Sequence, residues 1–393
     1  MEKEQLLNVG YDLIYLAACA LHGQTPKQEI MAEMSLSAVY TLARRHSMQA
    51  ITSVAVSSFV KAYPECQLGL ADETLKKWCE EYSRSLRKTI MFDAERENIL
   101  AELEKNGIWY LPLKGIILQE LYPTLGMRQM ADNDILFDRK YRQKLRTIMT
   151  GMGYKVETYN KGAHDVYVKP PFMNFEMHAY LYRESLNKCW ADYYNNMKTR
   201  MLKDETNQCG HHLSDEDFYV YITTHAYKHY SRGGNGVRSL MDVFVYLKQK
   251  FGELQMDYID SQLKQLEIYE YEKMTAALAN KLFSSKCENY RKLDELTEEE
   301  KEMLLFLISS GTYGRFDVAI SRKIDKDINN GGSKFKYYFR RLFPDMTYYR
   351  ENFPVVYKYK VLIPFFLGYR ALKALLDHPK KLIRELKLLI KRK

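Results

Sequence analysis

Leu111-Pro-Leu-Lys-Gly115 and Ala131-Asp-Asn-Asp-Ile-Leu-Phe137 are two short apolar stretches, each with charged residues at one end. The first follows the aromatic and β-branched run Ile-Trp-Tyr, so it predicts a strand that ends in a turn at the lysine and glycine. In the second, Asp132 and Asp134 stand at the head of the apolar run. Side chains two apart on a strand project from the same face. The pattern therefore predicts two carboxylates side by side where a strand begins.

A small sheet is predicted around these stretches. The hydrophobic period is helical up to about residue 106, alternates over residues 107–185, and becomes helical again afterwards. Strand and helix alternate first, and a meander of three strands follows, which is typical of a small mixed sheet. The predicted strands are 108–113, 132–137, 154–158, 164–169 and 172–180; the predicted helices are 116–122 and 139–152; the predicted turns are Lys161-Gly162 and Pro170-Pro171.

The last predicted strand brings a third acid. In Met173-Asn-Phe-Glu-Met-His178 the apolar residues alternate, so Asn174, Glu176 and His178 share the opposite face. Three carboxylates, Asp132, Asp134 and Glu176, suit a hard divalent cation such as Mg²⁺ or Mn²⁺. We expect His178 to be a hydrogen-bonding neighbour of that site.

The rest of the chain is predicted to be helical. We divide it into a helical N-terminal domain (1–106), the α/β core (107–185), a helical C-terminal domain (186–310) and a basic helical tail (311–393). Gly233-Gly-Asn-Gly236 and Asn329-Asn-Gly-Gly332 are the clearest loop signals. The fold class is therefore α+β, with a small mixed sheet inserted between two helical regions.

Composition indicates a globular protein of 393 residues, with 46% hydrophobic and 28% charged residues. Its six cysteines are scattered without a Cys-x-x-Cys pair, which argues against a zinc site or a disulfide framework and fits a reducing compartment. The first residues lack the basic and apolar regions of a secretion signal, and no apolar run of about 18 residues could span a bilayer. We expect a cytoplasmic protein without a transmembrane segment.

The net charge of +9 is unevenly distributed. Residues 311–393 carry 20 Lys and Arg against 7 Asp and Glu, whereas the rest of the chain carries 39 against 43. After Pro379 the tail has an apolar stripe, Leu382, Ile383, Leu386, Leu389 and Ile390, surrounded by lysine and arginine. Such a helix either packs on the protein itself or contacts an anionic membrane surface or nucleic acid.

The acidic residues fit the chemistry of nucleotidyl transfer, which needs charge neutralisation and in-line positioning. Asp132 and Asp134 would be ligands shared by two metal ions. Glu176 would complete the ion that binds the incoming nucleophile and would accept its proton. The turn at Lys114 and Gly115 lets the backbone approach phosphates beside a cation. Arg128 either neutralises the triphosphate or forms a salt bridge with the acidic pair.

The later helices add further polar residues. His225, Lys228 and His229 share one face of a helix at spacings of three and four. Lys228 either reaches the triphosphate or belongs to a buried polar cluster. Asp242 and Arg238 are expected to form an i,i+4 ion pair, with a ribose or base contact as the alternative for Asp242.

These motifs together resemble a bacterial family of uncharacterised nucleotidyltransferases in the polymerase-β-type superfamily. The resemblance rests on Leu113-Lys-Gly115, Leu121-Tyr-Pro123, Arg128, Asp132-Asn-Asp-Ile-Leu136, Glu176-x-His178, His225-Ala-Tyr-Lys-His229 and Arg238-Ser-Leu-Met-Asp242. It implies a minimal nucleotidyltransferase core that uses Mg²⁺ and a nucleoside triphosphate. In the wider superfamily a serine or glycine usually follows the turn glycine, whereas Ile116 follows Gly115 here.

Three functions remain open from the sequence. The first is a metal-dependent nucleotidyltransferase acting on a small molecule, an RNA end or a protein. The second is a degenerate nucleotide-binding or scaffold protein, which the missing serine favours. The third is a glycosyltransferase whose Asp-x-Asp binds a nucleotide sugar, although there the apolar run usually precedes the acids. The neutral to acidic body argues against a long nucleic-acid groove in the core.

Overall fold

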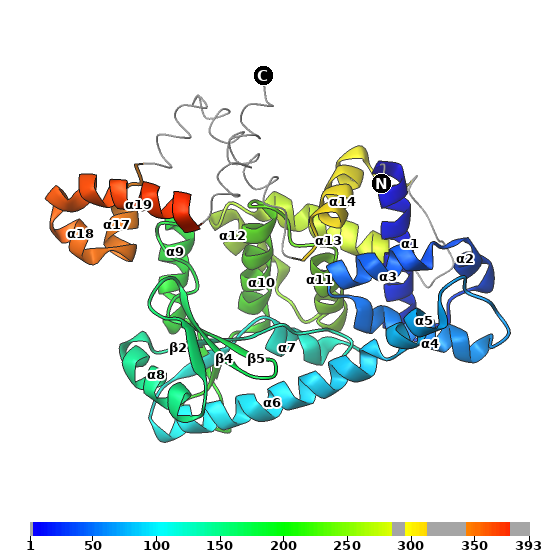
Figure 1. The fold of residues 1–393 in the computed structure, drawn as a ribbon, viewed down its shortest axis with the longest axis horizontal. Helices are drawn as coiled ribbons and strands as arrows, with labels where there is room; N and C mark the ends of the chain where they lie inside the picture. Colours follow the sequence, from blue (N-terminus) through cyan, green and yellow to red (C-terminus); the bar gives the residue numbers. More distant parts are fainter. Residues whose placement is uncertain (1–2, 285–294, 313–342, 378–393) are drawn as a thin grey trace.

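The computed structural model describes residues 3–284, 295–312 and 343–377. At its centre lies a five-stranded mixed sheet with the order β1-β2-β5-β4-β3, which confirms the predicted α+β class (Figure 1). Only β2 and β5 run parallel. The strands are β1 (Tyr110–Pro112), β2 (Asn133–Phe137), β3 (Lys155–Thr158), β4 (His164–Lys169) and β5 (Met173–His178).

Alternation gives the sheet two different faces. In β5 the side chains of Met173, Phe175 and Met177 are buried, and they pack with Ile135 and Phe137 of β2 in one hydrophobic core. The helices α6 (Glu81–Lys105) and α8 (Arg142–Gly151) contribute to the same core and cover this face. Figure 1 shows the long α6 running beneath the sheet toward the N-terminal helices. The other face, called the polar face below, carries Asp134 and Glu176 side by side, while Leu111 and Leu136 at its β1 end pack in a second hydrophobic core with the later helices.

All five predicted strands are found: β4 has the predicted bounds, and the other four are shorter than predicted. The predicted helix 116–122 becomes α7 (Gly115–Leu118) and a 3-10 turn (Gln119–Leu121), and the helix predicted at 139–152 starts with another 3-10 turn (Arg139–Tyr141). One prediction is wrong: the region after residue 186 is not helical throughout. A two-stranded sheet of β6 (Leu202–Lys203) and β7 (His211–His212) interrupts it. Strands of two residues carry no readable alternation, which is why the sequence does not reveal them.

The two helical regions share one hydrophobic core. Helix α1 (Lys3–Leu21) is buried along most of its length and is surrounded by helices from both ends of the chain. The N-terminal helices are α2 (Gln28–Glu33), α3 (Leu36–Arg45), α4 (Gln49–Ala62) and α5 (Asp72–Cys79). The later ones are α9 (Lys188–Asn195), α10 (Asp215–Tyr230), α11 (Arg238–Gln249), α12 (Met256–Gln265), α13 (Tyr269–Phe283) and α14 (Glu298–Ser310), with a 3-10 turn at Met197–Thr199.

His46 joins these helices through hydrogen bonds in the core. Its Nδ1 accepts the backbone N–H of Val237 at 3.1 Å, so Nε2 carries the hydrogen and donates to the carbonyl of Ile308 at 3.1 Å. The ring is fully buried. Both contacts require the neutral imidazole, and burial lowers the pKa of His46 to about 4.

We therefore expect His46 to lower the free energy of unfolding as the pH is lowered. The unfolded chain takes up a proton near pH 6.5 and the folded chain only near pH 4, so stability is complete above pH 6.5 and declines between these values. The loss is at most about 3 kcal/mol. Urea unfolding at pH 7 and pH 5 checks this: His46→Asn should lower the free energy of unfolding at pH 7 and flatten its pH dependence. An equally steep dependence in the variant would contradict the assignment.

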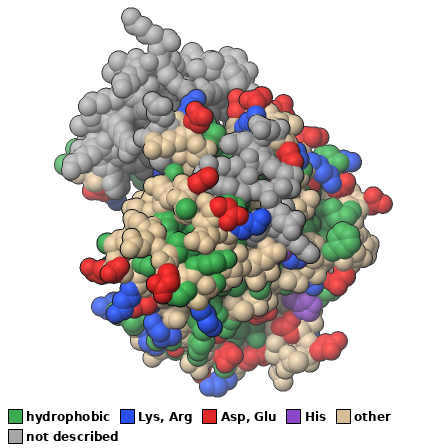
Figure 2. Space-filling model, turned by 90° about the vertical axis from the view of Figure 1, so that its right-hand side faces the viewer, with side chains coloured by type: hydrophobic (Ala, Val, Ile, Leu, Met, Phe, Trp, Pro, Cys, Tyr) green, Lys and Arg blue, Asp and Glu red, His purple; other side chains and the backbone are tan. Residues whose placement is uncertain are grey.

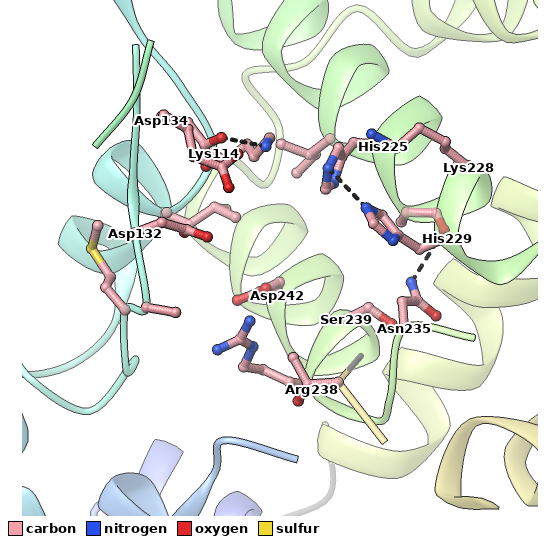
Figure 3. A pocket seen from close by; sticks show the side chains of 18 of the residues that line it. Lys114, Asp132, Asp134, His225, Lys228, His229, Asn235, Arg238, Ser239 and Asp242 are labelled. Carbon is pink, nitrogen blue, oxygen red and sulfur yellow. Dashed lines mark hydrogen bonds and ion pairs between the residues drawn. The ribbon is translucent and has the colours of Figure 1, made fainter. Parts of the chain in front are cut away.

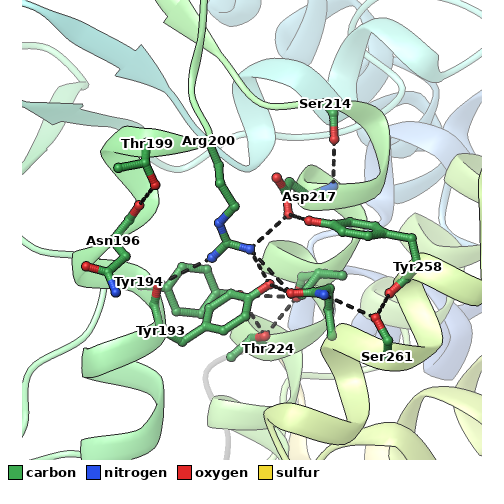
Figure 4. Close-up of polar contacts among 12 residues, drawn as sticks. Tyr193, Tyr194, Asn196, Thr199, Arg200, Ser214, Asp217, Thr224, Tyr258 and Ser261 are labelled. Carbon is green, nitrogen blue, oxygen red and sulfur yellow. Dashed lines mark hydrogen bonds and ion pairs between the residues drawn. The ribbon is translucent and has the colours of Figure 1, made fainter.

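A polar network fixes the first half of α10 (Figure 4). Arg200 donates to the hydroxyl of Tyr193 at 2.7 Å and pairs with Asp217 at 3.3 Å. Tyr258 of α12 donates to the same carboxylate at 2.9 Å, and Ser214 caps the helix by accepting the N–H of Asp217. Helix α10 is thus held from three sides, and its second half is presented toward the polar face of the sheet.

The last described part of the chain consists of α17 (Met346–Asn352), α18 (Pro354–Lys358), a 3-10 turn (Lys360–Leu362) and α19 (Ile363–Asp377). It contacts the core domain through Arg183, which pairs with Glu351 at 3.3 Å. The apolar stripe predicted after Pro379 and the loop predicted at Asn329-Asn-Gly-Gly332 lie outside the described residues. In the described ranges, no helix is both long and apolar enough to cross a membrane.

The surface visible in Figure 2 carries both signs of charge. Acidic and basic side chains are interspersed over this face, with hydrophobic side chains between them, rather than gathered by sign. This distribution agrees with the nearly balanced charge of the first 310 residues. The described residues seen in Figure 2 form no extended basic track of the kind that binds a nucleic-acid backbone.

Candidate active site

A cleft of about 820 Å³ separates the polar face of the sheet from α10 and α11. Its lining includes every residue that the sequence singles out as a site candidate: Lys114, Gly115, Arg128, Asp132, Asp134, Glu176, Lys228 and Asp242. In Figure 3, Lys114, Asp132 and Asp134 lie on one side, while His225, Lys228 and His229 face them from α10. The cleft thus has an acidic wall and a basic wall.

Sheet register builds the acidic wall. Asp134 of β2 lies directly beside Glu176 of the parallel strand β5, and both belong to the polar face. Asp132 precedes β2 by one residue and also lines the cleft. The ammonium of Lys114 contacts Asp134 Oδ1 at 2.5 Å, and His178 Nε2 donates to the same oxygen at 2.7 Å. Of the three carboxylates, Asp134 therefore has the negative charge that its neighbours stabilise most.

The three carboxylates differ in their protonation. Burial would raise the pKa of Asp134, but Lys114 and His178 hold it well below its usual range. Burial and the charge of Asp134 raise the pKa of Asp132, and burial together with Asp134 and Asp132 raises the pKa of Glu176 to about 7. Without a further cation, the protein thus cannot keep all three carboxylates ionised at low cost. A divalent cation bound between these carboxylates would offset their mutual repulsion, so the three oxygen donors suit such an ion.

The turn before α7 has an unusual backbone. Lys114, not Gly115, takes the left-handed conformation, with φ +48° and ψ −114°. A Cβ on residue 115 would lie 2.7 Å from Nη1 of Arg128, so glycine is required there for close packing against that guanidinium. Ile116, which stands where a serine is usual, is buried in the core under the sheet. The turn therefore offers phosphates a lysine and backbone groups but no hydroxyl.

The ion pair that the sequence predicts between Arg238 and Asp242 does not form in the described part of the chain. Asp242 instead accepts two hydrogen bonds from Arg128, at 2.7 and 2.9 Å, and one from the hydroxyl of Tyr122 at 2.7 Å. Arg238 donates to the carbonyl of Gln129. Helical spacing predicts Arg238 as the partner of Asp242. Arg128, from a different segment of the chain, instead makes a bidentate contact with this carboxylate, which is a stronger interaction. Asp242 thus has a structural partner that the sequence does not indicate.

Replacing Asp242 by asparagine should destabilise the fold. Arg128 is about nine-tenths buried and would keep its charge without a charged partner. Breaking a buried pair in this way costs about 3 kcal/mol or more. The free energy of unfolding of Asp242→Asn, measured in urea, checks the value, and the exposed Asp257→Asn on α12 is the matched control. A loss no larger than that of the control would mean that the pair contributes little.

The basic wall consists of residues without acidic partners. Among the described residues, Lys228 and Arg232 form no hydrogen bond or ion pair through their charged groups, although Lys228 lies over the ring of Tyr182. Burial, with the charges of Lys114 and Arg232, lowers the pKa of Lys228 to about 8. His225 and His229 are held neutral because burial and these cations depress their pKa values. The unpaired positive charges of this wall therefore favour binding of an anion.

His164 is the main site residue that the sequence analysis did not select. It lies directly opposite His178 in the antiparallel pairing of β4 and β5 and lines the cleft. Burial and the neighbouring His178 and Lys114 lower its pKa to about 4. The predicted turn at Pro170-Pro171 comes within one residue of revealing it. Counting outward from these two residues pairs residue 164 with 177, whereas three residues separate the strands and residue 164 pairs with 178. Arg232 and Tyr182 also line the cleft without a distinctive sequence pattern, as does Asn235, which the sequence marked only as part of a loop.

Comparison with known proteins gives one match. A family model described as "Uncharacterised nucleotidyltransferase" matches residues 33–284, which is more than half of the chain and includes both walls of the cleft. No curated protein and no solved structure matches.

Proposed function

This chain belongs to the uncharacterised nucleotidyltransferase family, and from that premise we propose that it moves a nucleoside monophosphate from a nucleoside triphosphate to a hydroxyl or phosphate acceptor, releasing pyrophosphate. One observation carries the proposal. Asp134 and Glu176 lie side by side in register, Asp132 precedes them, and two cations without acidic partners face them across one cleft. The acceptor, whether a small molecule, an RNA end or a protein, stays open.

The acidic wall would hold Mg²⁺ or Mn²⁺. Asp132 and Asp134 provide carboxylate oxygens at the head of β2, and Glu176 adds a third. A bound ion would neutralise the phosphates and polarise the reacting oxygens. Glu176, with a pKa of about 7, is suited to accept the proton of an acceptor hydroxyl near neutral pH.

The basic wall would bind the triphosphate. Lys228 and Arg232 have no acidic partner among the described residues and line the cleft, and Lys114 lies between Asp134 and the helix that carries Lys228. These side chains would neutralise the charge of the leaving pyrophosphate, which is the main task of protein groups in such transfers. They also compensate for the hydroxyl that Ile116 cannot provide, which weakens the case for a degenerate nucleotide-binding protein.

We expect Lys228→Met to weaken binding of the triphosphate about tenfold, because a charge-assisted hydrogen bond contributes about 1.5 kcal/mol or more. Equilibrium dialysis with labelled nucleoside triphosphate and Mg²⁺ gives the dissociation constant. Lys144→Met is the control, since this lysine is exposed on α8 at the opposite side of the sheet. Equal affinities of the two variants for the triphosphate would show that Lys228 does not bind its phosphates.

The activity is tested by incubating the protein with each α-³²P nucleoside triphosphate, Mg²⁺ or Mn²⁺, and a lysate divided into RNA, protein and small-molecule fractions. Label should appear in one fraction with the native protein and not with the Asp132→Ala/Asp134→Ala double variant. No transfer from any nucleotide, with folded protein and metal present, would favour a scaffold protein. Transfer of sugar from a nucleotide sugar instead would favour the glycosyltransferase.

A further inference from the structure

Two imidazoles and a carboxylate meet on the polar face of β4 and β5. His164 and His178 lie opposite each other on the antiparallel strands, and Glu176 precedes His178 by two residues on the same face. His164 Nε2 lies 3.5 Å and His178 Nε2 3.8 Å from Glu176 Oε2. One donor atom of each residue falls within 4.8 Å of the others. Backbone pairing, rather than chance proximity of long side chains, sets this arrangement.

We propose that His164, Glu176 and His178 form a second metal position, which takes a first-row transition ion such as Zn²⁺ in preference to Mg²⁺. The proposal rests on the proposed function and extends it. Asp132 and Asp134 offer only oxygen and suit Mg²⁺, whereas two imidazoles and one carboxylate are a donor set typical of zinc sites with an open coordination position. The two positions thus differ in the kind of ion they select.

The donor separations are compatible with a single ion. Metal–ligand bonds of about 2.1 Å place neighbouring donors roughly 3.4 Å apart. The two histidine–glutamate separations, 3.5 and 3.8 Å, are already close to this value, and the remaining separation, within 4.8 Å, needs to close by at most about 1.5 Å. Coordination through Nε2 of His178 moves its hydrogen to Nδ1 and ends the hydrogen bond to Asp134. Nδ1 has no hydrogen-bond partner in the described ranges, so no existing contact at that nitrogen has to break when it takes up the hydrogen. The charge of the ion then replaces that hydrogen bond at Asp134.

The position has a definite place in the reaction. Glu176 lies in register with Asp134 on the side of the cleft that we assign to the acceptor. Lys228 lies across the cleft, on the phosphate side. A transition ion lowers the pKa of a coordinated water or hydroxyl more strongly than Mg²⁺ does. We therefore assign this position to an acceptor that reacts through a hydroxyl group.

Metal binding can be measured without nucleotide or acceptor. The full chain is stripped of metal and titrated with Co²⁺, whose visible absorption reports nitrogen coordination, and with Zn²⁺ and Mg²⁺ by calorimetry. We expect His164→Ala to weaken binding of Co²⁺ and Zn²⁺ about tenfold or more and to change Mg²⁺ affinity less than about twofold. Asp132→Asn should do the reverse. His164→Gln repeats the test if the alanine variant does not fold.

Two controls separate this position from other histidines. His212→Ala removes an exposed histidine on β7 that pairs with Asp204, and His229→Ala removes the pair formed by His225 and His229 on α10. Loss of the Co²⁺ absorption in either of these variants, or its persistence in His164→Ala, would overturn the proposal. Nucleotidyl transfer without nitrogen-coordinated metal would leave the proposed function intact. Nitrogen coordination without any nucleotidyl transfer would instead support this metal position and contradict the proposed function.

Discussion

Replacing Asp132 by asparagine should reduce nucleotidyl transfer about 1000-fold while making the metal-free protein more stable. The loss follows because a metal-binding carboxylate in such a site contributes several kcal/mol, and about 4 kcal/mol corresponds to a factor of about 1000. The gain follows because burial and the charge of Asp134 raise the pKa of Asp132, so its ionised form is unfavourable in the folded state without metal.

Two measurements are needed for this variant. Label transfer gives the rate, and thermal unfolding in the presence of a chelator gives the stability of the metal-free protein. Asp192→Asn on α9 is the matched control, because this aspartate is exposed and does not line the cleft. A lower melting temperature together with lost activity would indicate that Asp132 holds the fold together rather than the metal.

Lys114 is the second position with a large expected effect. Its ammonium lies between Asp134 and the basic wall, so removing it should reduce transfer about 100-fold, as loss of one aimed electrostatic group commonly does. Both Lys114→Ala and Lys114→Gly lose the ammonium. They differ in the backbone, because residue 114 has φ +48°, which glycine adopts freely and alanine does not.

The glycine variant should therefore be more stable than the alanine variant by about 1 kcal/mol, although neither is active. Urea unfolding of the two proteins measures this difference independently of the lost ion pair. Lys140→Ala is the control for activity, since Lys140 is exposed, contacts Asp138 and the ring of Tyr141, and does not line the cleft. Equal stabilities would mean that the backbone at residue 114 is relaxed. Full activity in either variant would remove Lys114 from the site.

Much of the acidic wall could be predicted because it depends on local periodicity. Spacing by two residues places Asp132 beside Asp134 and puts Glu176 on the face opposite to Phe175, and the sheet keeps this alternation. The positions of the strands along the chain follow from the change in hydrophobic period. These features need no knowledge of how distant segments pack.

The basic wall could be predicted only in part. Helical spacing groups His225, Lys228 and His229, but the orientation of α10 toward the sheet depends on core packing and on the contacts of Arg200 and Asp217. The pairing of Arg128 with Asp242 joins segments 114 residues apart, so neighbour rules could not supply it. The positive φ of Lys114 could not be predicted either, because sequence rules assign a positive φ to the glycine that follows it.

The central claim is transfer of the nucleotidyl group, and it is tested most directly by comparing two labels in one nucleoside triphosphate. The acceptor fraction is incubated with the protein and either the α-³²P or the γ-³²P form. We predict that the α label enters the acceptor and the γ label is recovered as pyrophosphate in equal amount. Entry of the γ label into the acceptor, with the α label retained in nucleoside diphosphate, would identify phosphoryl transfer and contradict the account.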